Sequence, residues 1–137
     1  MIFLYFVGSI PSTAFADKTA ELVPVIEEAR SNAQSAINLL NSLQQTTDPT
    51  LKSRYTNCIG YYNQVSKFLI EAEGFAKTGL YTDVGRAASS ALETVLHCEG
   101  EFKEPPPAPS SLQQINTKES TLCNNIFNLS GSPPSVV

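Results

Sequence analysis

The sequence has few of the residues that catalytic and metal sites require, with one histidine (His97), one methionine and no tryptophan among 137 residues. It is also poor in charge, since 9 basic and 13 acidic residues make up 16% of the chain, against about 25% in an average soluble domain. The net charge of −4 leaves no basic stripe of the kind that phosphate backbones require. We therefore expect no nucleic-acid partner, no cofactor and no metal site.

The sequence does contain apolar residues in helical order. They make up 42% of the chain, which is enough for the core of one domain. From Asp17 onward they recur at steps of three and four, and no strand-like alternation interrupts them. Four stripes result, at residues 22–43, 51–76, 84–98 and 112–129. Joined by short turns and one proline loop, they predict an all-α protein, an antiparallel up-down-up-down four-helix bundle over residues 17–130.

Residues with special backbone or capping preferences mark the expected ends of these helices. Asp48 and Pro49 predict a helix start, with the aspartate as cap and the proline in the first turn. Gly79 predicts the end of that helix, because glycine adopts the left-handed conformation without strain. Thr82 or Asp83 is expected to start the next helix.

Prolines and polar residues give three further boundaries. Pro24 lacks the amide hydrogen of a helix interior, so we expect it in a first turn or at a kink. Gly100 should end the third helix, and residues 104–109 read as a stiff, polyproline-like connector. Ser111 and Gln114 have the spacing of a capping box. Residues 131–137 are expected to form a flexible tail.

The first sixteen residues admit two interpretations. An apolar run at residues 1–10 precedes Ala14-Phe15-Ala16, which has the small-x-small form of a signal-peptidase site. This run is shorter than the roughly 20 residues that a membrane-spanning helix needs, so a secretory signal is favoured over an anchor. No basic residue precedes the run and Gly8 interrupts it, so a remnant of a truncated structural element is the alternative.

The three cysteines predict one disulfide and one free thiol. Cys58 lies 21 residues before Gly79 and Cys98 lies 19 residues after it, so an antiparallel hairpin that turns there places them side by side. In an oxidising compartment they would form a disulfide, and in the cytosol two buried thiols. Cys123 has no evident mate and is expected to be a buried free thiol, with an intermolecular bridge as the alternative.

Several of these residues belong to segments that resemble the plant invertase and pectin methylesterase inhibitor family, from about Ala16 to Leu129. The segments are Asp48 to Lys52, Asn57 to Tyr62 (NCIGYY), Gly79 to Asp83 (GLYTD) and His97 to Lys103 (HCEGEFK). The last of them is most similar to the invertase-inhibitor and pollen-allergen branch. The resemblance implies a four-helix bundle with a disulfide between Cys58 and Cys98, secreted to the cell wall, where it covers the cleft of a carbohydrate-active enzyme.

The chain departs from the family pattern in three ways. Family members carry an N-terminal helical hairpin with its own cysteine pair, and this sequence has neither cysteine. On the truncated-element interpretation, Tyr5-Phe6-Val7 is a remnant of the second arm of that hairpin. Inhibitors of invertase often have Pro-Lys-Phe in the turn after the second helix, whereas this chain has Gly79-Leu80-Tyr81. The family also occurs as a pro-region of pectin methylesterase, and residues 1–137 contain no segment that resembles the catalytic domain of that enzyme.

An inhibitor needs a rigid exposed patch, and the turn at Leu80, Tyr81, Thr82 and Asp83 is the candidate. The alternative is that Leu80 and Tyr81 attach the turn to the core while Thr82 or Asp83 caps the helix. Outward charges could add contacts at the rim, at Lys67, Glu71 and Arg86. Asn128 begins the one glycosylation triplet in the chain.

These observations predict a monomeric, extracellular, non-catalytic inhibitor of pectin methylesterase or invertase, without a membrane partner. An enzyme is disfavoured because no facing carboxylate pair is evident and Cys123 has no histidine beside it to act as a base. The alternative to an inhibitor is a non-inhibitory secreted bundle, a degenerate member of the family with a structural or interaction role.

Overall fold

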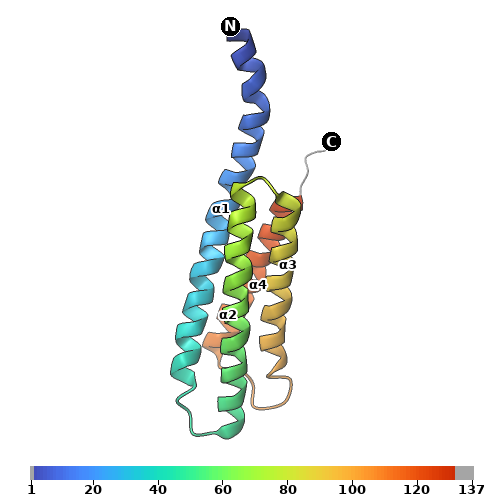
Figure 1. Cartoon of the computed structure of the whole chain (residues 1–137). Coiled ribbons are helices and arrows are strands. Elements are labelled where there is room, and N and C mark those ends of the chain that lie inside the picture. The colour runs from blue at the N-terminus through green and yellow to red at the C-terminus, as the bar shows by residue number, and fades with distance from the viewer. Residues whose placement is uncertain (1, 132–137) are drawn as a thin grey trace.

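The computed structural model describes residues 2–131, with side chains placed from residue 16 onward. The described chain folds into four helices connected by three loops (Figure 1). They are α1 (Ile2–Leu43), α2 (Pro49–Lys77), α3 (Tyr81–Gly100) and α4 (Ser110–Gly131). The predicted tail lies outside the described residues except for Gly131, which ends α4.

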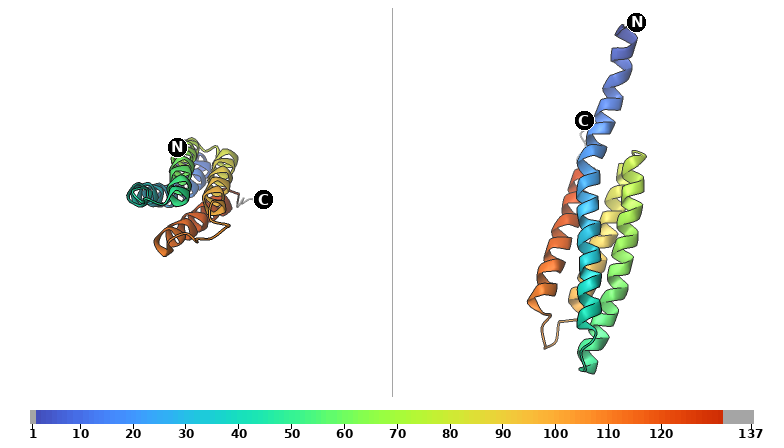
Figure 2. Two further views of the ribbon diagram at one scale, coloured as in Figure 1. Left: turned by 90° about the horizontal axis from the view of Figure 1, so that it is seen from below. Right: turned by 90° about the vertical axis from the view of Figure 1, so that its left-hand side faces the viewer.

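The helices run antiparallel in up-down-up-down order, which confirms the predicted four-helix bundle (Figures 1 and 2). Each helix packs against two neighbours, because α1 contacts both α2 and α4 while α3 contacts both α2 and α4. The turn between α2 and α3 lies at the end from which α1 projects, and the other two loops lie at the opposite end (Figure 1). Within the described residues, no helix combines the length and the apolar character needed to cross a membrane.

The four predicted stripes meet in one core. Tyr62 is the largest fully buried side chain, and its hydroxyl donates to Asn116 Oδ1 of α4 at 2.6 Å. Small buried residues on α3, among them Ala88 and Ala91, allow its neighbours to approach closely. The rest of the core is aliphatic and comes from all four helices, with Leu22, Ile26, Leu40, Val65, Leu69, Val84, Val95, Leu112 and Ile126 all buried.

α1 differs from the sequence prediction at its start. The expectation that Pro24 stands in a first turn is wrong, because α1 begins at Ile2 and Pro24 lies deep in its interior. Pro24 is exposed, whereas Leu22 and Ile26 on either side of it are fully buried. Burial of these neighbours against the bundle stabilises the helix across a residue that donates no hydrogen bond. Residues 2–16 continue the same helix beyond the bundle (Figure 2).

The predicted boundaries of α2 are confirmed and that of α4 is corrected. Asp48 caps α2, since its carboxylate accepts from the amides of Thr50 at 2.9 Å and Leu51 at 3.2 Å. The expected capping box at Ser111 is wrong, because α4 begins at Ser110. The carbonyl of Pro109 accepts from the amides of Leu112 and Gln113, each at 3.0 Å, so Ser111 lies inside the first turn.

The α2–α3 hairpin is closed by the predicted disulfide. Cys58 and Cys98 are bonded, with their Cα atoms 4.9 Å apart, near the end of the hairpin opposite the turn. Cys123 is buried and free, as predicted. The proline connector is non-helical, and Arg54 of α2 holds it by donating to the carbonyls of Glu104 at 3.0 Å and Pro106 at 2.9 Å.

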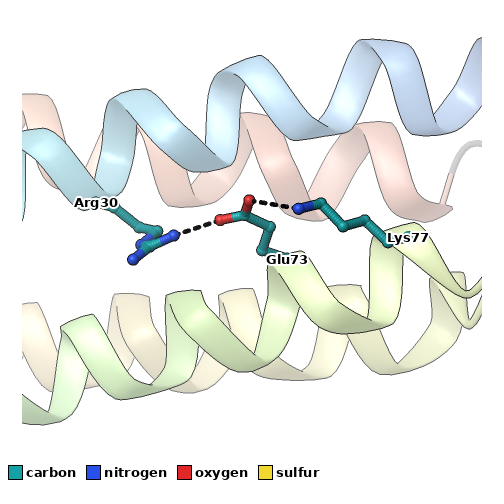
Figure 3. A network of polar contacts seen from close by, with 3 residues as sticks. All are labelled: Arg30, Glu73 and Lys77. Atoms are coloured by element: carbon teal, nitrogen blue, oxygen red, sulfur yellow. Dashed lines mark hydrogen bonds and ion pairs between the residues drawn. The ribbon is translucent and has the colours of Figure 1, made fainter.

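An ion-pair network around the buried carboxylate of Glu73 joins α1 to α2 (Figure 3). The Glu73 carboxylate is paired with Arg30 Nη1 of α1 at 2.6 Å and with Lys77 Nζ at 3.1 Å. Burial alone would raise the pKa of Glu73, but the hydrogen bonds from Arg30 and Lys77 outweigh it and the pKa is lowered. The network therefore keeps a negative charge inside the α1–α2 seam.

Candidate functional site

The turn between α2 and α3 is built on a glycine at a position that requires one. Gly79 has φ of 77°, in the left-handed region. Its amide donates to the carbonyl of Ala76 at 3.3 Å, and the Leu80 amide donates to the carbonyl of Phe75 at 2.9 Å. This pair of bonds is a Schellman motif, which satisfies the last carbonyls of α2 and reverses the chain in few residues. The predicted helix end at Gly79 is confirmed.

α3 starts earlier than predicted. It begins at Tyr81, with Leu80 in the cap position and no side-chain cap bond, so neither Thr82 nor Asp83 is the cap. Asp83 lies within the first turn instead, where a negative charge interacts favourably with the helix dipole. Its carboxylate also accepts from Arg86 Nη1 at 2.8 Å. Two polar side chains thus brace the first turn of α3 without capping it.

Tyr81 fastens this turn to α1. The hydroxyl of Thr19 donates to the carbonyl of Ala76 at 2.9 Å and lies 2.8 Å from the Tyr81 hydroxyl. Because the single hydroxyl hydrogen of Thr19 is used on Ala76, the Tyr81 hydroxyl is the donor between them. Lys18 Nζ lies 5.2 Å from the centre of the Tyr81 ring, within the range of a cation–π contact. Thr19 of α1 therefore contacts both the end of α2, at Ala76, and the start of α3, at Tyr81.

Leu80 is held differently from Tyr81. Its side chain is 49% exposed, whereas Tyr81 is partly buried and hydrogen bonded. Thr82 is exposed as well. The turn therefore presents an apolar and a polar side chain to solvent on a backbone that hydrogen bonds fix on both sides.

A groove lies beside the turn, between α3 and α4. Its volume is about 560 Å³, and it is lined by Tyr81, Thr82, Gly85, Arg86, Ser89, Phe127, Ser130 and Gly131. The Phe127 side chain is 48% exposed on the α4 wall. Sequence reasoning missed Phe127. Its position one residue after Ile126 places it off the apolar stripe of the helix, which was the one indication that this aromatic side chain is exposed. Of the three predicted rim charges Arg86 lines this groove, while Lys67 and Glu71 lie exposed on α2.

The remaining predicted residues lie apart from one another. His97 is exposed, and its ring centre lies 5.6 Å from that of Tyr61. Burial raises the pKa of the Cys123 thiol to about 12, and Glu119 adds to the shift, so the sulfur stays protonated. Among residues 16–131, no cluster of three His, Cys, Asp or Glu side chains is placed to hold a metal ion. At the turn, the described residues form an exposed surface on a hydrogen-bonded backbone.

Asn128, the predicted glycosylation position, is exposed on α4 one residue after Phe127. The third residue of its triplet, Ser130, is buried and donates from its hydroxyl to the carbonyl of Phe127 at 2.8 Å. Asn128 itself does not line the groove. The modification itself stays a prediction.

Comparison with known proteins gives one curated relative and a set of solved structures. A search of family models finds no match. A pectinesterase inhibitor of Actinidia deliciosa is 33% identical over 110 residues, which are 80% of this chain. The chain spans only 60% of the length of that relative.

The solved structures include a pectin methylesterase inhibitor from Arabidopsis thaliana, with a TM-score of 0.81 at 21% identity over 87% of this chain and 80% of that one. A mutant form of an Arabidopsis inhibitor gives the same TM-score and identity, over 88% and 82% of the two chains. At this identity the structures establish a shared fold. Together with the Actinidia relative, they confirm that this chain resembles the plant invertase and pectin methylesterase inhibitor family in sequence as well as in fold.

Proposed function

We propose that this protein is a non-catalytic, secreted inhibitor that binds as a monomer to a plant cell-wall enzyme and covers its active-site cleft. The observation that carries the proposal is the 33% identity to a pectinesterase inhibitor over 110 residues. Pectin methylesterase is the preferred target over invertase for that reason. The turn supports the same choice, because it reads Gly79-Leu80-Tyr81 where inhibitors of invertase often have Pro-Lys-Phe.

The turn residues Leu80, Tyr81, Thr82 and Asp83 are the proposed docking site. Binding is strongest when an exposed apolar side chain is ordered before it meets its partner, because little conformational entropy is then lost. Leu80 satisfies this condition, since its amide is bonded to Phe75 and its side chain is half exposed. Tyr81 serves as the support of the turn, and Arg86 and Phe127 extend the surface along the groove.

The test is titration of pectin methylesterase and, separately, of invertase with the full chain. The expected result is a fall in pectin methylesterase activity as the protein is added, with invertase unaffected. Full activity of both enzymes at saturating amounts of a cooperatively folded protein would reject inhibition and favour the non-inhibitory bundle. Loss of invertase activity alone would reverse the choice of target.

A pair of variants locates the docking site. Leu80 and Leu96 are both leucines of 49% exposure, one at the turn and one on the body of α3. We expect Leu80→Asp to raise the inhibition constant at least about tenfold, as loss of a central apolar contact does, and Leu96→Asp to leave it unchanged. If the chain inhibits but Leu80→Asp inhibits equally well, docking takes place on another face.

A further inference from the structure

Glu119 of α4 is a carboxyl that the fold buries without a charge partner. The residue is 0% exposed, and Oε1 accepts a hydrogen bond from Asn32 Nδ2 of α1 at 2.7 Å. Among the described residues, Oε2 has no hydrogen-bond partner although it is buried. A buried, half-satisfied carboxyl favours its neutral form, because the single hydrogen bond from Asn32 does not replace the hydration that an ionised carboxylate loses.

The same contact joins α4 to α1. Asn32 Nδ2 also donates to the carbonyl of Ile115 at 3.1 Å, so one amide group holds both the backbone of α4 and the Glu119 side chain. Glu73, the other buried carboxylate of the core, is held by two cations instead. The α1–α2 seam therefore contains a carboxyl group that favours its charged form, and the α1–α4 seam contains one that favours its neutral form.

No neighbouring cation is placed to neutralise Glu119. Lys118 is 56% exposed, and its Nζ points to Glu28 of α1 at 3.7 Å. Burial is the largest influence on the pKa of Glu119 and raises it. The hydrogen bond from Asn32 and, least of all, the attraction of Lys118 lower it. Solvent screens a charge that exposed.

The other groups that face this carboxyl stay neutral through physiological pH. Tyr62 of α2 and Cys123 of α4 both have raised pKa values, chiefly from burial and partly from the Glu119 charge. From α3, Glu99 acts on Tyr62, and Cys98 lies in the disulfide near Asn116. Neither Tyr62 nor Cys123 therefore supplies a positive charge that would stabilise an ionised Glu119.

We propose that Glu119 makes the packing of α4 on α1 dependent on a proton, so that the bundle is tightest when this carboxyl is neutral and loosens when it ionises. The device is a seam within one chain, and it operates whether or not the protein inhibits an enzyme.

The direction and range of the effect follow from linkage. Burial raises the pKa of Glu119 from near 4.5 to about 7 in the folded protein. Between these values the folded state holds a proton that the unfolded chain has released, so the Glu119 contribution to stability is complete below pH 4.5 and is lost as pH rises to about 7. A difference of this size changes the unfolding equilibrium constant by about two to three orders of magnitude.

The experiment compares denaturant unfolding of the full, disulfide-bonded chain and of two variants from pH 4 to pH 8. Glu119→Gln keeps the shape and can accept from Asn32, but it cannot ionise. Glu93→Gln removes the same charge from the exposed face of α3. We expect the loss of stability between pH 4.5 and pH 7 to disappear in Glu119→Gln, which then exceeds the parent in stability above pH 7, and to persist in Glu93→Gln.

Identical pH profiles for the parent and Glu119→Gln would overturn the proposal. If Glu119→Gln fails to fold, carbon-13 NMR of the Glu119 carboxyl in the parent protein decides instead. A titration midpoint above about 6 supports the proposal, and a midpoint near the ordinary glutamate value of about 4.3 overturns it.

Discussion

At the scale of single residues, Glu73 shows what a buried carboxylate needs in order to stay charged. It accepts from Arg30 and Lys77, and these bonds hold its pKa below the usual range in spite of burial. A lowered pKa contributes stability that is present above the unfolded value of about 4.3 and is lost as pH falls through the folded value. The α1–α2 seam is therefore strongest at neutral pH and weakens in acid.

Replacing one partner of this pair should reveal that dependence. We expect Arg30→Gln to lower the free energy of unfolding by about 1–2 kcal/mol at pH 7, because the nearly buried Glu73 loses a charged hydrogen bond. The loss should shrink as pH falls through the lowered pKa of Glu73 and the carboxylate takes up a proton. Urea unfolding at pH 7 and at successively lower pH values measures it. Arg86→Gln, which breaks the exposed pair with Asp83, should cost less than about 0.5 kcal/mol, and an equal loss in both variants would contradict the argument.

At the scale of the helices, the apolar stripes and the helix ends with a strong capping residue were predictable from sequence, while helix starts without a side-chain cap were not. The Asp48 cap and the Gly79 end hold because each residue supplies a bond or a conformation that others supply poorly. The starts at Tyr81 and Ser110 escaped prediction because no side-chain cap sets them. Tertiary contacts decide such starts, as the Tyr81 bond to Thr19 illustrates. Pro24 does not mark a helix start because the buried neighbours Leu22 and Ile26 hold α1 against the bundle on both sides of it.

Helix contacts also decide what the same substitution does at two glycines. Gly60 lies within α2 with nothing within 4 Å of an added Cβ, whereas at Gly85 that atom would lie 2.7 Å from Ser130 Oγ of α4. We expect Gly60→Ala to raise the free energy of unfolding by about 0.5–1 kcal/mol through helix propensity. Gly85→Ala should lower it, because a clash of about 1–3 kcal/mol exceeds that gain. Thermal unfolding of both variants tests this, and equal shifts would show that α3 and α4 are not closely packed at this point.

At the scale of the whole molecule, sequence predicted the position of the α2–α3 turn better than the shape of the surface around it. Leu80 to Asp83 are adjacent in the chain, so any hairpin ending at Gly79 brings them together. Phe127 joins the groove from α4, which is more than forty residues away in sequence, and only the α3–α4 packing around Gly85 places it there. A surface formed by two helices in this way has no periodic signal, because its residues lie off both apolar stripes.

The α2–α3 hairpin is fixed at one end by the hydrogen-bonded turn at Gly79 and at the other by the Cys58–Cys98 disulfide. The bond closes a loop with a sequence separation of 40, and in the chain-entropy model such a loop contributes about 4 kcal/mol by restricting the unfolded chain. Since small domains have net stabilities of about 5–15 kcal/mol, its loss should leave the bundle marginal. We expect Cys58→Ala/Cys98→Ala to melt at a much lower temperature, with the parent falling to a similar value after reduction. Cys123→Ala serves as the control, because it removes a buried thiol but no crosslink and should retain the full response to reductant. If reduction leaves the parent melting temperature unchanged, the hairpin is stabilised by core packing and the turn alone.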